Sequence, residues 1–277
     1  MTRDALILLA REDTMHSPNT AVPAPAARTD LQGRIAMIVG ASRGLGKGIA
    51  KAFADAGAKV VAVSRTPVPA DAPGDGATHT EIADARTDTT AATLLTKHDP
   101  DILVLVAGAI PPMGTIREQS WETFSLNWDT DVRIAFHWLQ AVLSKPLKPG
   151  ARVVVISSGA AIAGSPLSGG YAGAKATQRF IAQYAQDEAL RAGLDIAIST
   201  VLPRFAPATG VGTLAVRAYA ERAGVDVDEY LQTFQRAFGA LVTPESAGCA
   251  IVGLACTEAS EIAPAYLLTG DGLQKLS

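Results

Sequence analysis

Short apolar runs alternate with longer segments of helical periodicity from Gly33 onward. Runs that are apolar at nearly every position are typical of strands buried on both faces of a parallel sheet. Strands are expected at 35–39, 59–63, 80–82, 102–106, 152–156 and 196–201, and helices at 44–56, 89–97, 124–144 and 172–192. This alternation predicts an α/β fold, a doubly wound parallel β-sheet with right-handed crossovers and helices on both faces.

The chain shows no internal repeat and no change of composition over residues 30–277, which we expect to form a single domain. Residues 1–29 differ, because Pro, Ala, Ser and Asn dominate from Met15 to Ala27, as is typical of a mobile leader. Acidic residues flank the short apolar run near the N-terminus and argue against a signal peptide. A cytoplasmic location is therefore expected, and Met15 is a second candidate start.

Composition and charge exclude several classes of partner. The 277 residues carry a formal net charge of -3 and no long basic run, which argues against nucleic-acid binding. No apolar stretch is long enough to cross a bilayer, so no membrane partner is expected. The four histidines are scattered without ligand spacing, and we predict no metal. Cys249 and Cys256 are expected to be small buried side chains on one helix face, not a disulfide.

The first strand ends in a glycine-rich turn at residues 40–46. In open parallel sheets, ligands bind beyond the carboxyl ends of the strands. Glycines there allow a pyrophosphate to approach the backbone and rest on the N–H groups of the next helix. The spacing differs from the usual G-x-G-x-x-G fingerprint, so a tight connection without a ligand is the alternative. The predicted cofactor contacts here are Gly40, Ser42, Arg43, Gly44, Leu45 and Gly46.

The end of the second strand indicates which cofactor binds. A carboxylate about 20 residues after the glycines would bind the ribose 2′-hydroxyl of NAD, but Ser64 and Arg65 stand there. Arg65 and Arg43 suit a 2′-phosphate, so NADP(H) is the predicted cofactor, with a solvated Arg65 as the alternative. After the third strand, Asp84 is placed to accept from the adenine amino group or to cap a helix, and Ala85 beside it joins the predicted cofactor site.

Candidate catalytic residues follow strand 152–156. Ser158 lies at its carboxyl end, where a hydroxyl can bond a substrate oxygen, and Ser157 is interpreted as a residue that ends the strand and caps a turn. Tyr171 and Lys175 share one face of the helix that follows. Because a nearby ammonium favours the phenolate form, Tyr171 is a candidate acid/base near neutral pH.

With these motifs the chain resembles the short-chain dehydrogenase/reductase family from about Asp30 to its C-terminus. The resemblance implies a Rossmann-like sheet of about seven strands, a homodimer or homotetramer, and a contact from Lys175 to the nicotinamide ribose. It also implies that segment 204–242, which carries aromatic residues at helical spacing, selects the substrate.

Several positions depart from the family pattern. Ala107 and Gly108 keep the family's Ala-Gly turn after the fourth strand, but the asparagine that precedes it is lost. The family's catalytic asparagine corresponds to Asp131, with Asn127 one turn earlier as a substitute under a different alignment. Its asparagine helps to hold a water that relays protons from the lysine.

The family's Pro-Gly pair after the sixth strand is replaced by Pro203 and Arg204. Arg204 could recognise an anionic substrate, or face solvent or a neighbouring subunit. Thr209 resembles, one position late, the threonine that contacts the cofactor's carboxamide.

Together these residues predict an NADPH-dependent oxidoreductase, a carbonyl reductase or alcohol dehydrogenase acting on a ketone or secondary alcohol. Ser158 would polarise the carbonyl, Tyr171 would transfer the proton, and Lys175 would tune Tyr171, with Asp131 in the relay. Two alternatives keep the same cofactor site: a non-redox epimerase or lyase, and an NADP(H)-binding sensor with little turnover.

Overall fold

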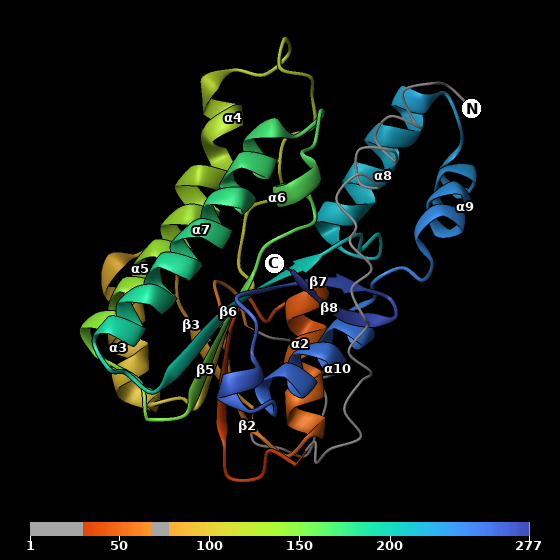
Figure 1. Ribbon diagram of the computed structural model, residues 1–277. Coiled ribbons are helices and arrows are strands. Elements are labelled where there is room, and N and C mark those ends of the chain that lie inside the picture. Colours follow the sequence, from red (N-terminus) through yellow and green to blue (C-terminus); the bar gives the residue numbers. More distant parts are fainter. Residues whose placement is uncertain (1–29, 68–77, 277) are drawn as a thin grey trace.

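A computed structural model describes residues 30–67 and 78–276, and one eight-stranded sheet runs through it (Figure 1). The strand order is β3-β2-β1-β4-β5-β6-β7-β8, with β7 and β8 antiparallel and every other pair parallel. The strands are β1 (Ile35–Val39), β2 (Lys59–Ser64), β3 (His79–Ile82), β4 (Ile102–Leu105), β5 (Ala151–Ile156), β6 (Ile196–Pro203), β7 (Ala265–Thr269) and β8 (Gly272–Leu276). The parallel α/β sheet is confirmed. The apolar pattern did not predict β7 or β8, and the antiparallel β8 brings the sheet to eight strands, where the resemblance implied about seven. The leader predicted at residues 1–29 lies outside the described residues.

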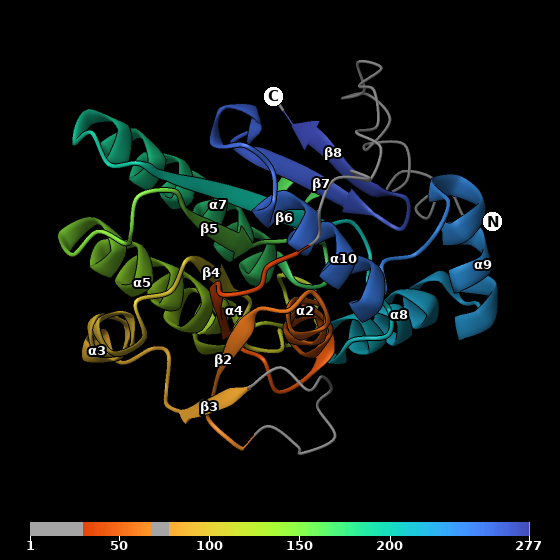
Figure 2. The same cartoon turned by 90° about the horizontal axis from the view of Figure 1, so that it is seen from below.

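Helices cover both faces of the sheet, as the doubly wound prediction requires (Figure 2). They are α2 (Gly44–Asp55), α3 (Asp88–His98), α4 (Trp121–Asn127), α5 (Arg133–Ser144), α6 (Ala160–Ala163), α7 (Gly169–Arg191), α8 (Gly210–Ala223), α9 (Val227–Phe238) and α10 (Pro244–Ala255). Helices α3, α5 and α7 pack on one face, and α2 and α10 pack on the other. Within the described residues, no helix combines the length and the apolar character that a membrane span requires.

Strand β1 is apolar at every position because both of its faces are buried. Successive side chains of a strand point to opposite faces. Met37 and Val39 join the core under α3, α5 and α7, whereas Ala36 and Ile38 join the core under α2 and α10. All four side chains are fully buried, so neither face tolerates a polar residue.

Helices α2 and α10 cross in very close contact, although α10 follows α2 by almost 190 residues along the chain. Gly48 of α2 lies directly against the backbone of Pro244, and a Cβ atom on Gly248 would lie 2.7 Å from the Cβ atom of Ala52. The absence of side chains at both glycines lets the two helix backbones approach. Helix α10 thereby covers Phe53 and the rest of the apolar face of α2.

The prediction for the two cysteines is wrong. Helix α10 turns Ala247, Ile251 and Ala255 toward the core, and this leaves Cys249 exposed on its other side. Cys256 falls at the C-cap, one residue past the helix, where it is half-buried. Both thiols are free, as expected, but they do not form one buried face.

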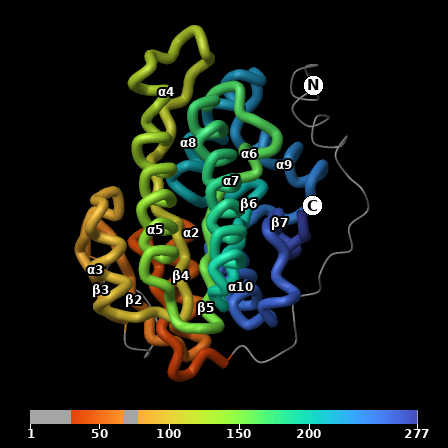
Figure 3. The backbone as a smooth tube through the Cα atoms, turned by 60° about the vertical axis from the view of Figure 1, so that its left-hand side comes forward, coloured from red at the N-terminus to blue at the C-terminus, as the bar shows by residue number. Residues whose placement is uncertain are grey.

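The helix expected at 124–144 is interrupted by a π-helical turn. A capping box between Ser120 and Thr123 starts α4 at Trp121, and the π-helical turn η1 (Trp128–Val132) separates α4 from α5. A π-helical turn holds more residues than an α-helical one, and such turns occur frequently at functional sites. The run from α4 through η1 to α5 lies alongside α7 (Figure 3).

Candidate active site

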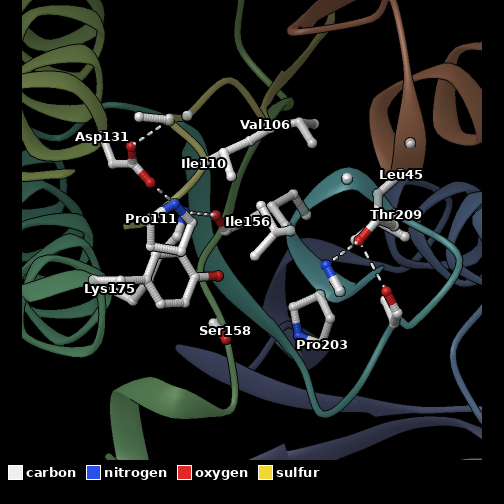
Figure 4. A pocket seen from close by; sticks show the side chains of 18 of the residues that line it. Leu45, Val106, Ile110, Pro111, Asp131, Ile156, Ser158, Lys175, Pro203 and Thr209 are labelled. Atoms are coloured by element: carbon white, nitrogen blue, oxygen red, sulfur yellow. Dashed lines mark hydrogen bonds and ion pairs between the residues drawn. The ribbon is translucent and has the colours of Figure 1, made fainter. Parts of the chain in front are cut away.

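A cavity of about 480 Å³ opens at the carboxyl ends of the parallel strands. Ten of its lining residues, among them Asp131, Ser158, Lys175 and Thr209, are labelled in Figure 4. The structure brings every predicted cofactor and catalytic residue to this one cavity. They are Gly40, Ser42, Arg43, Gly44, Leu45, Gly46, Ser64, Arg65, Asp84, Ala85, Ala107, Gly108, Asp131, Ser158, Tyr171, Lys175, Pro203 and Thr209.

The glycine loop forms a bare backbone surface between β1 and α2. Gly40 has a φ of +101°, and a Cβ atom on it would lie 2.6 Å from the backbone nitrogen of Ala107. Gly46 packs against the carbonyl of Gly40 in the same way. Arg43 is the N-cap of α2, and its side chain makes no capping hydrogen bond. The loop therefore fits a pyrophosphate, which binds to backbone N–H groups at a helix N-terminus.

Three arginines gather where the ribose 2′ position would lie in the predicted site. Arg43 and Arg65 are exposed, and neither forms a salt bridge with any described residue. Arg86, which the sequence analysis did not identify, pairs with Asp84 at 2.6 Å (Nη2 to Oδ2). The hydrogen bonds from Arg86, together with its charge and that of Arg65, lower the pKa of Asp84 to about 2 despite its partial burial. The Asp84 carboxylate is thus already held by Arg86, and its contact with adenine stays a prediction.

The other end of the cavity contains a buried ion pair between Asp131 and Lys175. Asp131 lies in the π-helical turn and Lys175 on α7, and their Oδ2 and Nζ atoms are 3.0 Å apart (Figure 4). Their side chains are only 1% and 6% exposed. Burial lowers the pKa of Lys175, but its electrostatic interactions with Asp131 and Tyr171 outweigh that effect and leave the pKa above its ordinary value. Lys175 is therefore a protonated cation at neutral pH.

Three oxygen atoms surround the Lys175 ammonium. Besides the Asp131 carboxylate, they are the side-chain oxygen of Gln178 at 2.9 Å and the carbonyl of Ile156 at 3.3 Å. An ammonium carries three N–H groups, so these contacts match its donors in number. Gln178 in turn donates to the Asp131 carbonyl at 2.9 Å. Gln178 was not predicted from the sequence, although its position three residues after Lys175 places it on the same helix face.

Asp131 is fixed from its other side by the turn after β4. Its Oδ1 atom accepts from the backbone N–H of Ala109 at 2.8 Å and from the side-chain amide of Asn127 at 3.3 Å. Asn127 also donates to the carbonyl of Ala109 at 3.0 Å. A Cβ atom on Gly108 would lie 2.6 Å from Asp131 Oδ2, so this turn requires a glycine. Asn127 therefore braces Asp131 and does not replace it.

Tyr171 lies one helical turn before Lys175, whose Nζ is 5.6 Å from the centre of the tyrosine ring. Ser158, half-buried in the loop after β5, accepts a hydrogen bond from the Ala160 N–H at 3.2 Å. Ser157 is buried and donates to the carbonyl of Lys175 at 2.8 Å. The interpretation of Ser157 as a turn-capping residue is therefore wrong, because its hydroxyl joins β5 to the catalytic helix.

Aromatic side chains and Arg204 form the remaining wall of the cavity. Arg204, Phe205 and Phe234 line the cavity, and the Phe205 and Phe234 rings are tilted with their centres 4.2 Å apart. Behind them, the ring centre of Phe238 lies 5.2 Å from the guanidinium of Arg204. The hydroxyl of Tyr219 on α8 lies 2.6 Å from Ser165 Oγ in the loop after α6. Segment 204–242 thus packs over the cavity, while its role in substrate selection stays a prediction.

Thr209, predicted to contact the cofactor, also has a structural function. Its hydroxyl accepts from the backbone N–H of Gly212 at 3.0 Å and donates to the carbonyl of Ala206 at 2.8 Å, which caps α8. Its side chain also lies next to Gly44 of the glycine loop, where an added Cβ atom would be in ordinary contact with Thr209 at 3.6 Å. Thr209 therefore joins the substrate-side helix to the predicted pyrophosphate site.

Known proteins share both the sequence pattern and the fold. Two relatives come from Bacillus subtilis (strain 168), and both are described as uncharacterized oxidoreductases. YvrD is 26% identical over 216 residues, covering 74% of this chain and 80% of the relative. YvaG is 29% identical over 205 residues, covering 69% and 75%.

Solved structures extend the comparison. A putative NAD(P) dependent gluconate 5-dehydrogenase from Beutenbergia cavernae, with bound NADP at low occupancy, is 27% identical, with a TM-score of 0.74 over 89% of this chain and 98% of that chain. A short chain dehydrogenase family protein from Francisella tularensis subsp. tularensis shares the fold at 18% identity, with a TM-score of 0.71 over 84% of this chain and 95% of that one. The family model described as short chain dehydrogenase matches residues 34–211, which is more than half of the sequence. The chain belongs to the short-chain dehydrogenase family of oxidoreductases.

Proposed function

We propose that the protein is an NADPH-dependent carbonyl reductase, or in reverse an alcohol dehydrogenase, acting on a ketone or secondary alcohol. The observation that carries the proposal is the shared cavity. Ser158, Tyr171 and Lys175 line the same space as the glycine loop and the two arginines without salt bridges. A dinucleotide on the loop would therefore bring its reactive ring to the hydroxyl groups.

The preference for NADPH rests on Arg43 and Arg65. Two guanidinium groups that form no salt bridge with the described residues suit a phosphate and not a ribose diol. The Beutenbergia cavernae structure, a similar protein with bound NADP at low occupancy, supports the same assignment. The glycine loop would hold the pyrophosphate, and Lys175 the nicotinamide ribose.

When bound, the nicotinamide supplies hydride to the substrate carbon or accepts it from that carbon. The side chains of the protein bind the oxygen of the substrate and supply its proton. In the reduction, Ser158 donates a hydrogen bond to the carbonyl oxygen and Tyr171 delivers a proton to it as the negative charge develops. Lys175 keeps a positive charge beside the tyrosine ring and stabilises the phenolate that is left.

Asp131 acts in this scheme as a positioning residue for Lys175. For the lysine to reach a ribose hydroxyl, one of its neutral contacts, Gln178 or the Ile156 carbonyl, must be exchanged for that hydroxyl. The ion pair with Asp131 keeps the ammonium in place during that exchange. We propose that Asp131 thus supports the site in the place where the family has asparagine.

We also propose that the protein forms a homodimer or homotetramer, as the family resemblance implies. The outer faces of α5 and α7 carry Phe136, Phe180 and Tyr184, which are 51%, 54% and 57% exposed. Exposed aromatic residues gathered on neighbouring helices are typical of protein interfaces. Sedimentation equilibrium of the full chain tests this expectation, and a monomer would contradict it.

The decisive experiment combines cofactor titration with a panel of ketones. NADPH is expected to bind more tightly than NADH and to be consumed with at least one ketone, followed at the nicotinamide absorbance. Tyr171→Phe is expected to lower kcat by about 10²–10⁴-fold, the usual contribution of acid–base catalysis. Tyr184→Phe, a matched change on the exposed face of the same helix, is expected to leave kcat unchanged.

The other outcomes separate the alternatives. Tight NADPH binding without turnover of any ketone would favour the sensor, and interconversion of stereoisomers without net NADPH consumption would favour an epimerase. A Tyr171→Phe variant with full activity would overturn the mechanism proposed here.

A further inference from the structure

Three metal-ligating side chains meet at the edge of the sheet, outside the cavity. His79 and Glu81 lie on the edge strand β3, and His98 is the last residue of α3. The Nε2 atoms of His79 and His98 lie 2.8 and 2.6 Å from one oxygen, Oε1 of Glu81. The ligand atoms of all three residues lie within 4.8 Å of one another.

The fold explains why these residues converge. His79 and Glu81 are two positions apart on a strand, so their side chains point to the same face. Helix α3 begins beyond the carboxyl end of β3 and runs back along the sheet, so its last residue returns to that strand. No metal was predicted from the sequence because the four histidines are scattered without ligand spacing, and His79 and His98 are 19 positions apart along the chain. Proximity in the fold now changes that interpretation.

We propose that His79, Glu81 and His98 bind one divalent transition-metal ion of the Zn²⁺ class, with water completing the coordination. Two imidazole nitrogens and one carboxylate oxygen form a ligand set that zinc uses in proteins, with bonds of about 2.0–2.2 Å. An ion of this size would lie between the three atoms, which are already near each other. The Glu81 and His98 side chains are 15% and 14% exposed, so two of the three ligands are held by surrounding structure.

Lys97 competes for the same place. Its Nζ atom lies 2.7 Å from Oε1 of Glu81, where the metal would bind. The Lys97 side chain is 54% exposed, so it can turn into solvent when an ion enters. Without a metal, the cluster is a hydrogen-bond network in which Lys97 and one N–H of each imidazole donate to the Glu81 carboxylate. The two states are therefore mutually exclusive and can be distinguished by removing Lys97.

The position of the site indicates a structural role. None of the three ligands lines the cavity that contains Ser158 and Tyr171. A bound ion would join the short edge strand β3 to the end of α3. We therefore expect the metal to raise the thermal stability of the protein and to leave its turnover unchanged.

The test uses the tag-free full chain, stripped with chelator and titrated with Zn²⁺ by calorimetry and with Co²⁺ by visible absorption. We expect one ion per chain at this site, a tetrahedral Co²⁺ spectrum and a higher Tm in Zn²⁺. His79→Ala and His98→Ala should each weaken binding by more than about tenfold, because even residues that only hydrogen-bond to a metal ligand contribute ~10–100-fold. Lys97→Met should tighten it, because the competing ammonium is gone.

His137→Ala, a histidine change on α5 outside the cluster, serves as the control and should leave Zn²⁺ binding unchanged. His79 is 56% exposed, so its replacement is not expected to unfold the chain. The proposal is overturned if the full chain binds no Zn²⁺, or if the His79 and His98 variants bind it as tightly as the unchanged protein. Weaker binding in Lys97→Met would also overturn it, because an ammonium that competes with the ion for Glu81 cannot strengthen binding of that ion.

Discussion

Two carboxylate–cation pairs line the same cavity, and they differ in how far each is removed from water. The Asp84–Arg86 pair is the shorter, at 2.6 Å, but its side chains are 33% and 44% exposed. The Asp131–Lys175 pair is longer, at 3.0 Å, with side chains that are 1% and 6% exposed. Exposed pairs contribute little to stability, whereas breaking a buried pair leaves an uncompensated charge in the interior. Burial, not distance, therefore decides which pair the fold depends on.

The largest effect is expected from breaking the buried pair. Asp131→Asn leaves the Lys175 ammonium without a counter-charge, and we expect unfolding in urea to require about 3–5 kcal/mol less free energy. Asp129→Asn, a matched change at an exposed position of the same π-helical turn, is expected to have almost no effect. Equal losses in the two variants would show that the turn and not the ion pair is responsible.

The stability that the Asp131–Lys175 pair contributes is expected to fall at alkaline pH. Because the pKa of Lys175 is raised above 10.5 in the folded protein, the stabilisation is present below that value and is lost as the pH rises through the folded pKa. Asp131→Asn should remove this alkaline loss. Denaturation curves between neutral and strongly alkaline pH, recorded for both proteins, provide the measurement.

At the exposed end of the cavity, near the Asp84–Arg86 pair, a substitution is expected to change the affinity for the cofactor and not the stability of the protein. Arg65→Ala removes a guanidinium that makes no salt bridge with the described residues, so the free energy of unfolding should hardly change. Loss of a charge-assisted hydrogen bond to the 2′-phosphate should weaken NADPH binding by about 1.5–3 kcal/mol, roughly 10- to 100-fold. NADH binding should stay the same, and so should both affinities in Arg191→Ala, a control at the far end of α7. Equal weakening of both cofactors would contradict the assignment of Arg65.

A smaller effect is expected from crowding the buried pair without changing any charge. In Gly108→Ala the new Cβ atom would lie 2.6 Å from Asp131 Oδ2, and overpacking of this kind costs about 1–3 kcal/mol. Gly114→Ala is the control, because its nearest neighbours would be at 3.6 Å, an ordinary contact. Thermal unfolding of the two variants compares them directly, and equal Tm values would mean that the turn after β4 can relax.

The smallest effect is expected from breaking the exposed pair. The pKa of Asp84 is about 2 in the folded protein and ordinarily 3.8, so its contribution is present above 3.8 and is lost as the pH falls through about 2. Solvent screening should limit that contribution to about 1 kcal/mol or less. Asp84→Asn should therefore be slightly less stable than the unchanged protein at pH 7 and equally stable near pH 2. A large loss at pH 7 would contradict the contrast between the two pairs.

The sequence predicted the parallel sheet well because strands buried on both faces need apolar residues at nearly every position. The sequence also allowed prediction of the glycine loop, Ser158, Tyr171 and Lys175, since these follow strand ends or share a helix face. The π-helical turn at Trp128–Val132 was not, because its residues are compatible with an ordinary α-helix.

Residues that act through tertiary contacts escaped the sequence analysis. Ser157 owes its contact with the Lys175 carbonyl, and Gln178 its contact with the Asp131 carbonyl, to elements that the fold brings near. The convergence of His79 with His98 is of the same kind.

Arg86 is different, because it pairs with Asp84 only two residues away and was missed despite that spacing. Cys249 was predicted to be buried because a spacing of seven residues places it on the same helix face as Cys256. That spacing does not say whether this face meets the core.

The crossing of α2 and α10 has a consequence for the order in which the chain can fold during synthesis. The helix that follows the glycine loop is made early, yet its apolar face is covered by a helix made some 190 residues later. The segment matched by the family model ends at residue 211, before α10 begins. A nascent chain of that length would expose Ile49 and Phe53 to water, and surfaces of this kind favour aggregation or chaperone binding. The cofactor loop of this protein should therefore become rigid only when its last fifth has left the ribosome.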